Sequence, residues 1–148
     1  MKLLKGKKGF TLLEVLIVVA IIIIISGIAV PRFLGVSNEG KKARAGGDLK
    51  VLQTAAESYA LNKNTVPPSG ADLEGASPQI VNNFAAFEDP FSPLSPKAKY
   101  TYVKDSTNKF YVFYSVGPNG AGGNAAIGSD GTITGLDADD IFVTNGKK

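Results

Sequence analysis

One acidic residue, Glu14, lies inside a long apolar run near the N-terminus and is the first group that could do chemistry. A carboxylate at the centre of a membrane helix costs about 2.5–3.5 kcal/mol, so Glu14 needs either the polar interface or a cationic partner. If the chain were cut after Gly9, Phe10 would gain a free α-amine four residues before Glu14. That amine could pair with Glu14 one helical turn away, or with Glu14 of a neighbouring chain.

A second group of candidate residues lies near the C-terminus, where acidic side chains follow the glycine-rich loop at residues 117–124. Four acids fall within eleven residues: Asp130, Asp137, Asp139 and Asp140. Clustered carboxylates repel one another unless they are solvated or bridged by a cation. Since Ca²⁺ takes six to eight oxygen ligands, the composition leaves open a solvated acidic loop or a calcium site. The spacing differs from that of an EF-hand.

The composition excludes several kinds of site. The 148 residues include no Cys and no His, which excludes disulfides, thiolate or imidazole metal ligands, and Ser-His or Cys-His catalysis. Four of the 16 Lys and Arg precede Gly9, which leaves 12 against 13 Asp and Glu and a net charge of −1. The basic leader therefore explains the overall positive charge, and we expect neither a nucleic-acid partner nor enzyme activity.

The apolar run, residues 10–30, is long enough to cross a membrane as one helix. At about 1.5 Å per residue it covers the roughly 30 Å of a bilayer's hydrocarbon core. Lysines precede the run, whereas only Arg32 closely follows it, so the positive-inside bias places the N-terminus in the cytoplasm. We predict a leader at residues 1–9. A secretory signal peptide is the rival interpretation, but its apolar region is usually 7–15 residues long.

The helix is predicted to continue through residues 31–62. Gly27 and Pro31 should kink or locally melt it, because proline removes a backbone hydrogen bond and glycine lowers helix stability by about 1 kcal/mol. Beyond them, apolar residues recur at helical spacing and should pack on a sheet: Leu49, Leu52, Ala56 and Tyr59.

Residues 63–148 are predicted to be rich in loops and to contain a small antiparallel sheet. Ser77-Pro78 predicts the start of a short helix over residues 79–84. Residues 100–103 and 110–116 are rich in aromatic and β-branched side chains, which predicts two strands joined as a hairpin. The fold class is therefore α+β, with a long N-terminal helix packed on a small antiparallel sheet.

The residues around Gly9 also carry a resemblance to a known family. Lys8-Gly9-Phe10-Thr11-Leu12-Leu13-Glu14-Val15 resembles the prepilin signature of type IV pilins and type II secretion pseudopilins. The resemblance implies that a prepilin peptidase cuts between Gly9 and Phe10 and methylates the Phe10 amine. It also implies that Glu14 helps the next subunit dock into a filament. Pro31 matches the kink proline of the family.

The C-terminal half resembles the major pseudopilin of type II secretion systems. The similar residues are Asp89-Pro90-Phe91, residues 113–120 and Asp139-Asp140-Ile141. In those proteins the loop binds calcium, which implies as ligands the carbonyls of Val116 and Ala121 and the side chains of Asn119, Asp139 and Asp140. Asp137 could substitute among the last ligands. Asn119 stands where the family usually has Asp, which removes one negative charge.

The resemblance implies a structural subunit that is held in the inner membrane, with its C-terminal domain in the periplasm. Copies would polymerise through the N-terminal helix into a pseudopilus for protein export. The implied partners are the prepilin peptidase, an inner-membrane assembly platform with its ATPase, and minor pseudopilins. Two alternatives stay open: a type IV pilin that forms a surface filament for adhesion, motility or DNA uptake, and a membrane-anchored binding protein that never polymerises.

Overall fold

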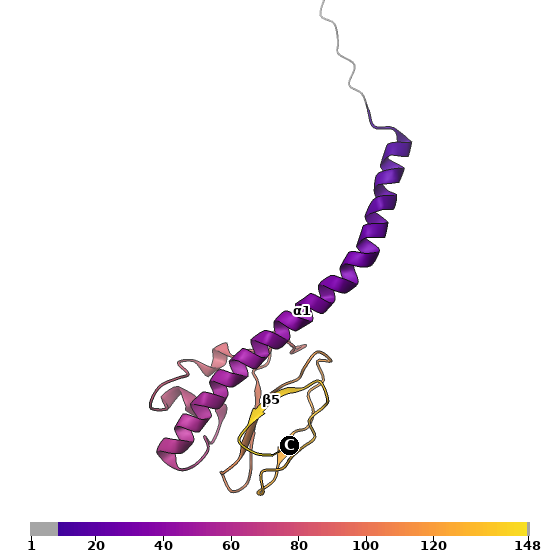
Figure 1. Cartoon of the computed structure of the whole chain (residues 1–148). Helices are drawn as coiled ribbons and strands as arrows, with labels where there is room; N and C mark the ends of the chain where they lie inside the picture. Colours follow the sequence, from indigo (N-terminus) through magenta and orange to yellow (C-terminus); the bar gives the residue numbers. More distant parts are fainter. Residues whose placement is uncertain (1–8, 148) are drawn as a thin grey trace, which may run out of the picture. The chain divides into compact units, whose positions relative to one another are not determined.

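The computed structural model describes residues 9–147 in two compact units, Met1–Ser37 and Asn38–Lys148. Apart from Gly9, the predicted leader lies outside the described residues. A single helix, α1 (Leu12–Lys63), contains residues of both units (Figure 1). Its end matches the sequence prediction within one residue, and Asn64 follows it with a φ of 55°.

The first unit consists, over its described residues, of a short extended segment and the first part of α1. All side chains from Gly9 to Ser37 are exposed. The helix runs unbroken through Pro31, where the sequence predicts a kink or a melted segment. A single proline removes one backbone hydrogen bond while the flanking turns keep theirs, so the helix does not melt here. The kink itself stays a prediction.

In the second unit, the C-terminal part of α1 packs on an antiparallel sheet of three strands. The strands are β1 (Thr101–Lys104), β2 (Tyr111–Ser115) and β5 (Ile141–Thr144), with β2 in the middle. Leu49, Leu52 and Ala56 are fully buried in one hydrophobic cluster with Tyr111 and Phe113. Burial of the helical stripe at this surface supplies the hydrophobic stabilisation of the unit and confirms the predicted packing.

The predicted hairpin is confirmed as β1 and β2, with Tyr102 opposite Phe113. Asp105 organises its turn, because this buried carboxylate accepts hydrogen bonds from the backbone N–H groups of Thr107, Lys109 and Phe110 at 2.8–2.9 Å. Desolvation alone would raise the pKa of Asp105. The hydrogen bonds outweigh it and hold the pKa below its ordinary value.

Two parts of the fold differ from the prediction or extend it. The predicted strands do not include β5, which pairs with β2, or a second hairpin of β3 (Ala126–Ile127) and β4 (Ile133–Thr134). The prediction of a short helix over residues 79–84 is wrong. The region instead contains the 3₁₀ helices Gly70–Gly75 and Phe84–Ala86.

The physical reason for the missing helix lies in hydrogen bonds to Glu74, which precedes the segment by a few residues. The Gln79 side chain donates to the Glu74 carbonyl at 2.8 Å, and the Phe84 N–H donates to the Glu74 carboxylate at 2.7 Å. Between these two anchors Val81 is buried in the core. A segment this short cannot nucleate a helix against such competition.

Candidate functional site

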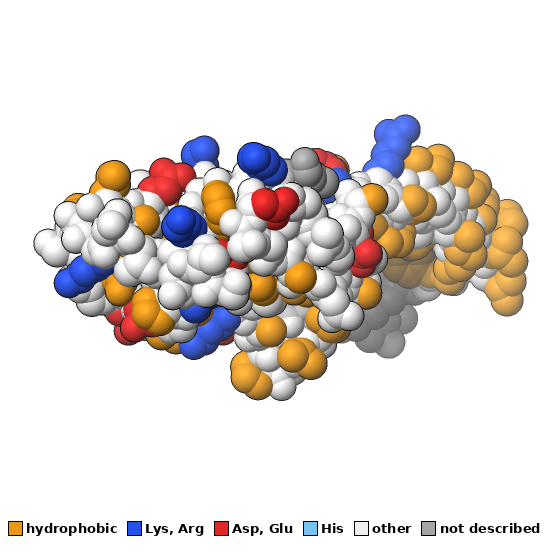
Figure 2. Space-filling model, turned by 90° about the horizontal axis from the view of Figure 1, so that it is seen from below, with side chains coloured by type: hydrophobic (Ala, Val, Ile, Leu, Met, Phe, Trp, Pro, Cys, Tyr) orange, Lys and Arg blue, Asp and Glu red, His pale blue; other side chains and the backbone are white. Residues whose placement is uncertain are grey.

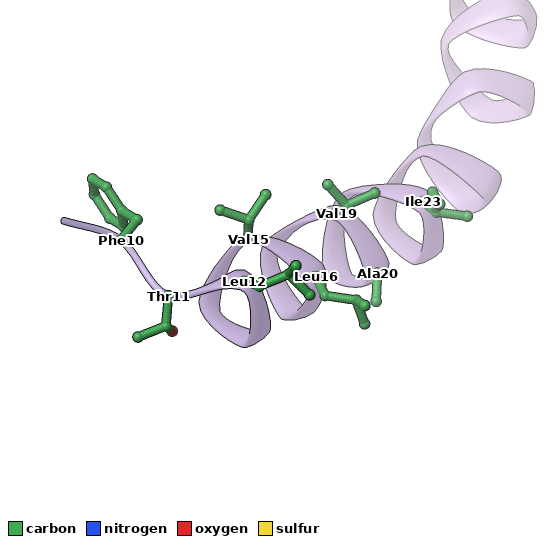
Figure 3. A pocket seen from close by; sticks show the side chains of 8 residues that line it. All are labelled: Phe10, Thr11, Leu12, Val15, Leu16, Val19, Ala20 and Ile23. Carbon is green, nitrogen blue, oxygen red and sulfur yellow. The ribbon is translucent and has the colours of Figure 1, made fainter.

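The predicted cleavage junction lies just outside α1. Gly9, Phe10 and Thr11 have no regular secondary structure, and the helix begins at Leu12. The Phe10 side chain is 84% exposed. Figure 3 shows Phe10 before the first turn, on the same side of the helix as Val15 and Val19. The Gly9–Phe10 peptide bond therefore lies outside the helix, between two exposed residues.

Glu14 is bonded to the start of its own helix. Its backbone N–H donates to Thr11 Oγ1 at 3.2 Å, and its Oε2 accepts from the Thr11 N–H at 3.5 Å. The Val15 N–H donates to the Thr11 carbonyl at 3.3 Å, which starts the helical ladder. This arrangement is a capping box, with threonine at the N-cap and glutamate three residues later. Glu14 thus has polar partners within its own chain. The sequence predicts instead that the membrane interface or a cationic group stabilises this carboxylate.

Exposed hydrophobic side chains lie on every side of the helix in the first unit, where Glu14 and Arg32 are the charged residues that the structure describes. Large hydrophobic side chains from Phe10 to Val36 are 49–84% exposed, and Figure 2 shows such side chains covering the visible part of this helix. By length and composition, α1 is the one described helix that could cross a membrane. An exposed apolar surface of this extent requires a covering partner, which is lipid or protein.

The predicted calcium loop brings Asn119 and Asp139 together. The Asn119 side-chain amide donates to Asp139 Oδ1 at 2.8 Å, and the Asn119 backbone N–H donates to Asp139 Oδ2 at 2.9 Å. The Asn119 Oδ1 in turn accepts from the Ala121 N–H at 2.7 Å. Gly117 is required beside them, since it has a φ of 66° and a Cβ there would lie 2.3 Å from the Asp139 carbonyl oxygen. We call these paired contacts the Asn119–Asp139 clasp.

Asp140 follows Asp139 in the chain, and only one of its carboxylate oxygens has a described hydrogen bond. Its Oδ2 accepts from the N–H groups of Asp137 at 2.8 Å and Gly123 at 3.4 Å. Its Oδ1 is buried and has no hydrogen-bond partner within the described chain. A buried carboxylate oxygen without a partner is costly unless a cation or water meets it, so the chemistry of this oxygen fits an oxygen-ligated cation.

Of the remaining predicted ligands, Asp137 has an exposed side chain, and Val116 and Ala121 would act through their backbone carbonyls. Among residues 9–147, no three acidic, His or Cys side chains gather closely enough to form a metal-binding group. The structure brings the Asn119 amide onto the Asp139 carboxylate, and a cation bound there would have to displace this hydrogen bond.

The sequence is similar to those of known proteins, most specifically around the Gly9–Phe10 junction and Glu14. Residues 4–30 match the family model of the prokaryotic N-terminal methylation motif. The chain is 29% identical to type II secretion system core protein G of Escherichia coli strain K12 over 133 residues, which are 86% of this chain and 85% of that protein. It is 28% identical to the protein of the same name from Vibrio cholerae serotype O1 over 138 residues, 88% of this chain and 93% of that protein.

The chain is pilin-like. A fimbrial protein of Pseudomonas aeruginosa is 41% identical over 66 residues, but these cover only 45% of the pilin-like chain and 43% of that protein. No solved structure was found that matches this chain. By name, these relatives belong to type II secretion systems and to fimbriae.

The pilin-like chain also has a buried polar network that the sequence analysis misses. Asp89 is 2% exposed and accepts hydrogen bonds from Ser115 Oγ at 2.8 Å and from the N–H groups of Phe91 at 2.9 Å and Val116 at 2.8 Å. This carboxylate joins the Asp89–Phe91 turn to the end of β2, where the loop begins. Asp89-Pro90 indicates a turn in the sequence, but no local pattern indicates that the Asp89 carboxylate reaches the end of β2.

Proposed function

We propose that this protein is a structural subunit that polymerises into the pseudopilus of a type II secretion system and so drives protein export through the outer membrane. One observation carries the proposal: an accessible Gly9–Phe10 junction, with Glu14 in the first turn of an apolar helix, precedes a domain alignable with core protein G. A surface filament is the alternative. The fimbrial relative aligns with less than half of the chain, which favours the pseudopilus.

The bilayer and the filament would serve as successive partners for the same apolar surface. Before assembly, residues 10–30 span the inner membrane with the N-terminus in the cytoplasm and the second unit in the periplasm. After the cut behind Gly9, the apolar helices of many copies bury one another. The exposed hydrophobic side chains of the first unit support this exchange, because burying them against protein helices keeps them out of water.

The N-terminal chemistry would link processing to assembly. A prepilin peptidase cleaves the Gly9–Phe10 bond and methylates the Phe10 amine, which remains cationic. The Glu14 carboxylate attracts the amine of another copy, and a charge pair of this kind is strongest where water is excluded. An inner-membrane platform, its ATPase and minor pseudopilins would complete the machinery. The proposal gives the chain itself no catalytic role.

We also propose that the C-terminal loop accepts calcium weakly. The Asp140 Oδ1 atom, the Asp139 carboxylate and the carbonyls of Val116 and Ala121 would hold the ion. Its role would be to neutralise adjacent carboxylates and stabilise the loop. Asn119 supplies an amide in place of a third carboxylate. Its two N–H groups already donate hydrogen bonds to the Asp139 carboxylate, which would weaken calcium binding.

Intact-mass spectrometry of the protein extracted from cells that contain its own peptidase tests the processing step. We expect a chain that starts at Phe10 and is one methyl group heavier than the unmodified sequence. A chain that retains residues 1–9 would contradict the proposal. Deletion of the gene then separates the alternatives, since loss of protein export with surface filaments unchanged indicates a pseudopilus, and the reverse result indicates a pilus.

A further inference from the structure

The capping box gives Glu14 a fixed place before any other copy is present. Thr11 projects away from the side of the helix that carries Phe10 and Val15 (Figure 3), and its hydroxyl oxygen accepts from the Glu14 N–H. The Glu14 carboxylate returns to the Thr11 N–H through Oε2. Only Oε2 takes part in the described hydrogen bonds of this carboxylate.

We propose that Thr11 is a positioning residue for assembly, because its capping box holds the Glu14 carboxylate at the N-terminal end of α1, where the α-amine of a second processed copy can meet it. This inference rests on the proposed function. The chemistry recognised is a primary or methylated ammonium group at the start of an identical chain.

The physical setting makes the capping box stronger than it would be in water. The first four N–H groups of a helix have no partner within the helix, and at membrane depth each unsatisfied group costs several kcal/mol. Glu14 and Thr11 satisfy two of them, and the positive end of the helix dipole further favours a carboxylate there. The bond from the Thr11 N–H is long at 3.5 Å, so an incoming ammonium can take over that oxygen.

Restraining the Glu14 carboxylate before docking reduces the side-chain entropy that is lost when a second copy binds. A free glutamate side chain samples many rotamers, and fixing it at the moment of docking opposes association. The Thr11 hydroxyl fixes the first turn and so places the Glu14 backbone, and the Thr11 N–H restrains the carboxylate before docking, which is preorganisation of a binding group. The role of Thr11 is therefore distinct from that of Glu14: Thr11 supplies geometry and Glu14 supplies charge.

Amide hydrogen exchange on the full-length precursor in detergent micelles tests the capping box without requiring assembly. Thr11→Val removes the acceptor with little change in shape, Thr11→Ser keeps it, and Thr54→Val is a matched control at an exposed turn of the same helix. We expect about fivefold faster exchange of the Glu14 amide in Thr11→Val and no change in the other two. Equal exchange of this amide in all three variants would overturn the proposal.

Filament yield from cells tests the consequence for assembly. We expect Thr11→Val to be cleaved normally and to lower the yield about fivefold, while Thr11→Ser restores it. Glu14→Gln should keep the capping box, since glutamine also serves at this position, and yet lose the filaments with the charge. A Thr11→Val variant that assembles like the wild type refutes the positioning role. If even the wild type forms no filaments, the proposed function fails, whereas the exchange measurement still decides the capping box.

Discussion

Replacing Asn119 by aspartate should make the stability of this protein depend on calcium. In the native loop the Asn119 side-chain amide donates to Asp139 at 2.8 Å, and this hydrogen bond joins the two loops. The aspartate side chain would have no hydrogen to donate and would place a second carboxylate against Asp139. Asp140, whose Oδ1 atom has no partner in the described chain, follows Asp139 directly in the sequence.

The expected destabilisation follows from the two lost features of the clasp. A hydrogen bond to a charged group contributes about 1.5–3 kcal/mol, and two unit charges in water repel by about 1 kcal/mol at 4 Å. Asn119 is exposed, so solvent screens the pair and we take about 2 kcal/mol as the total. For a domain of about 100 residues this lowers Tm by roughly 8–16 °C in chelator. Calcium at about 100 times its Kd would return about 2.7 kcal/mol.

Thermal unfolding of the full chain in detergent, with calcium and with a chelator, measures both effects. We expect the wild type to shift by only a few degrees between the two conditions, and Asn119→Asp to recover most of its lost Tm when calcium is added. Asn119→Ala is the matched control, because it breaks the hydrogen bond without adding charge and should not be rescued. The reasoning is refuted if the wild type loses as much Tm in chelator as Asn119→Asp does.

Three further changes test other parts of the account. Glu14→Ala should leave cleavage after Gly9 intact, seen by mass spectrometry, and strongly lower filament yield. Asp89→Ala should lower the free energy of unfolding by about 3 kcal/mol in denaturant titrations, because it leaves buried donors without an acceptor. Asp105→Asn should be less stable than the wild type at neutral pH. Because hydrogen bonds depress the folded-state pKa of Asp105, the unfolded chain takes up the proton first, and the wild-type advantage should disappear as pH falls below about 4.

For each of these three substitutions, one result would contradict the prediction. Normal filament yield in Glu14→Ala would show that the carboxylate does not pair during assembly. Asp89→Ala as stable as Glu57→Ala, an exposed control, would mean that the buried network contributes nothing. A pH-independent difference between Asp105→Asn and the wild type would place the effect outside the titration of Asp105.

The sequence predicts the parts of this fold that depend on local periodicity. The spacing of Leu49, Leu52 and Ala56 identifies the buried face of α1, and the aromatic pattern of residues 110–116 identifies the central strand. The end of the helix at Lys63 follows from the Asn-rich segment and the prolines beyond it. These features are visible because propensity and tertiary packing agree there.

The missed features depend on contacts between distant residues. The run Ile141-Phe142-Val143-Thr144 has strong β propensity, but its neighbour β2 lies more than twenty residues earlier in the chain. The helix predicted at residues 79–84 is displaced by bonds to Glu74, which no local pattern reveals. In the candidate site, the Thr11-x-x-Glu14 spacing does signal a capping box, whereas the Asn119–Asp139 clasp joins two loops whose proximity only the structure gives.

Electron microscopy of filaments from cells that express this chain with its peptidase tests the central claim most directly. The account predicts helical filaments whose subunits start at Phe10 and contact one another through the apolar part of α1, and it predicts none from the Glu14→Ala variant. A correctly processed wild-type chain that remains a single membrane-anchored subunit at high expression would contradict the account.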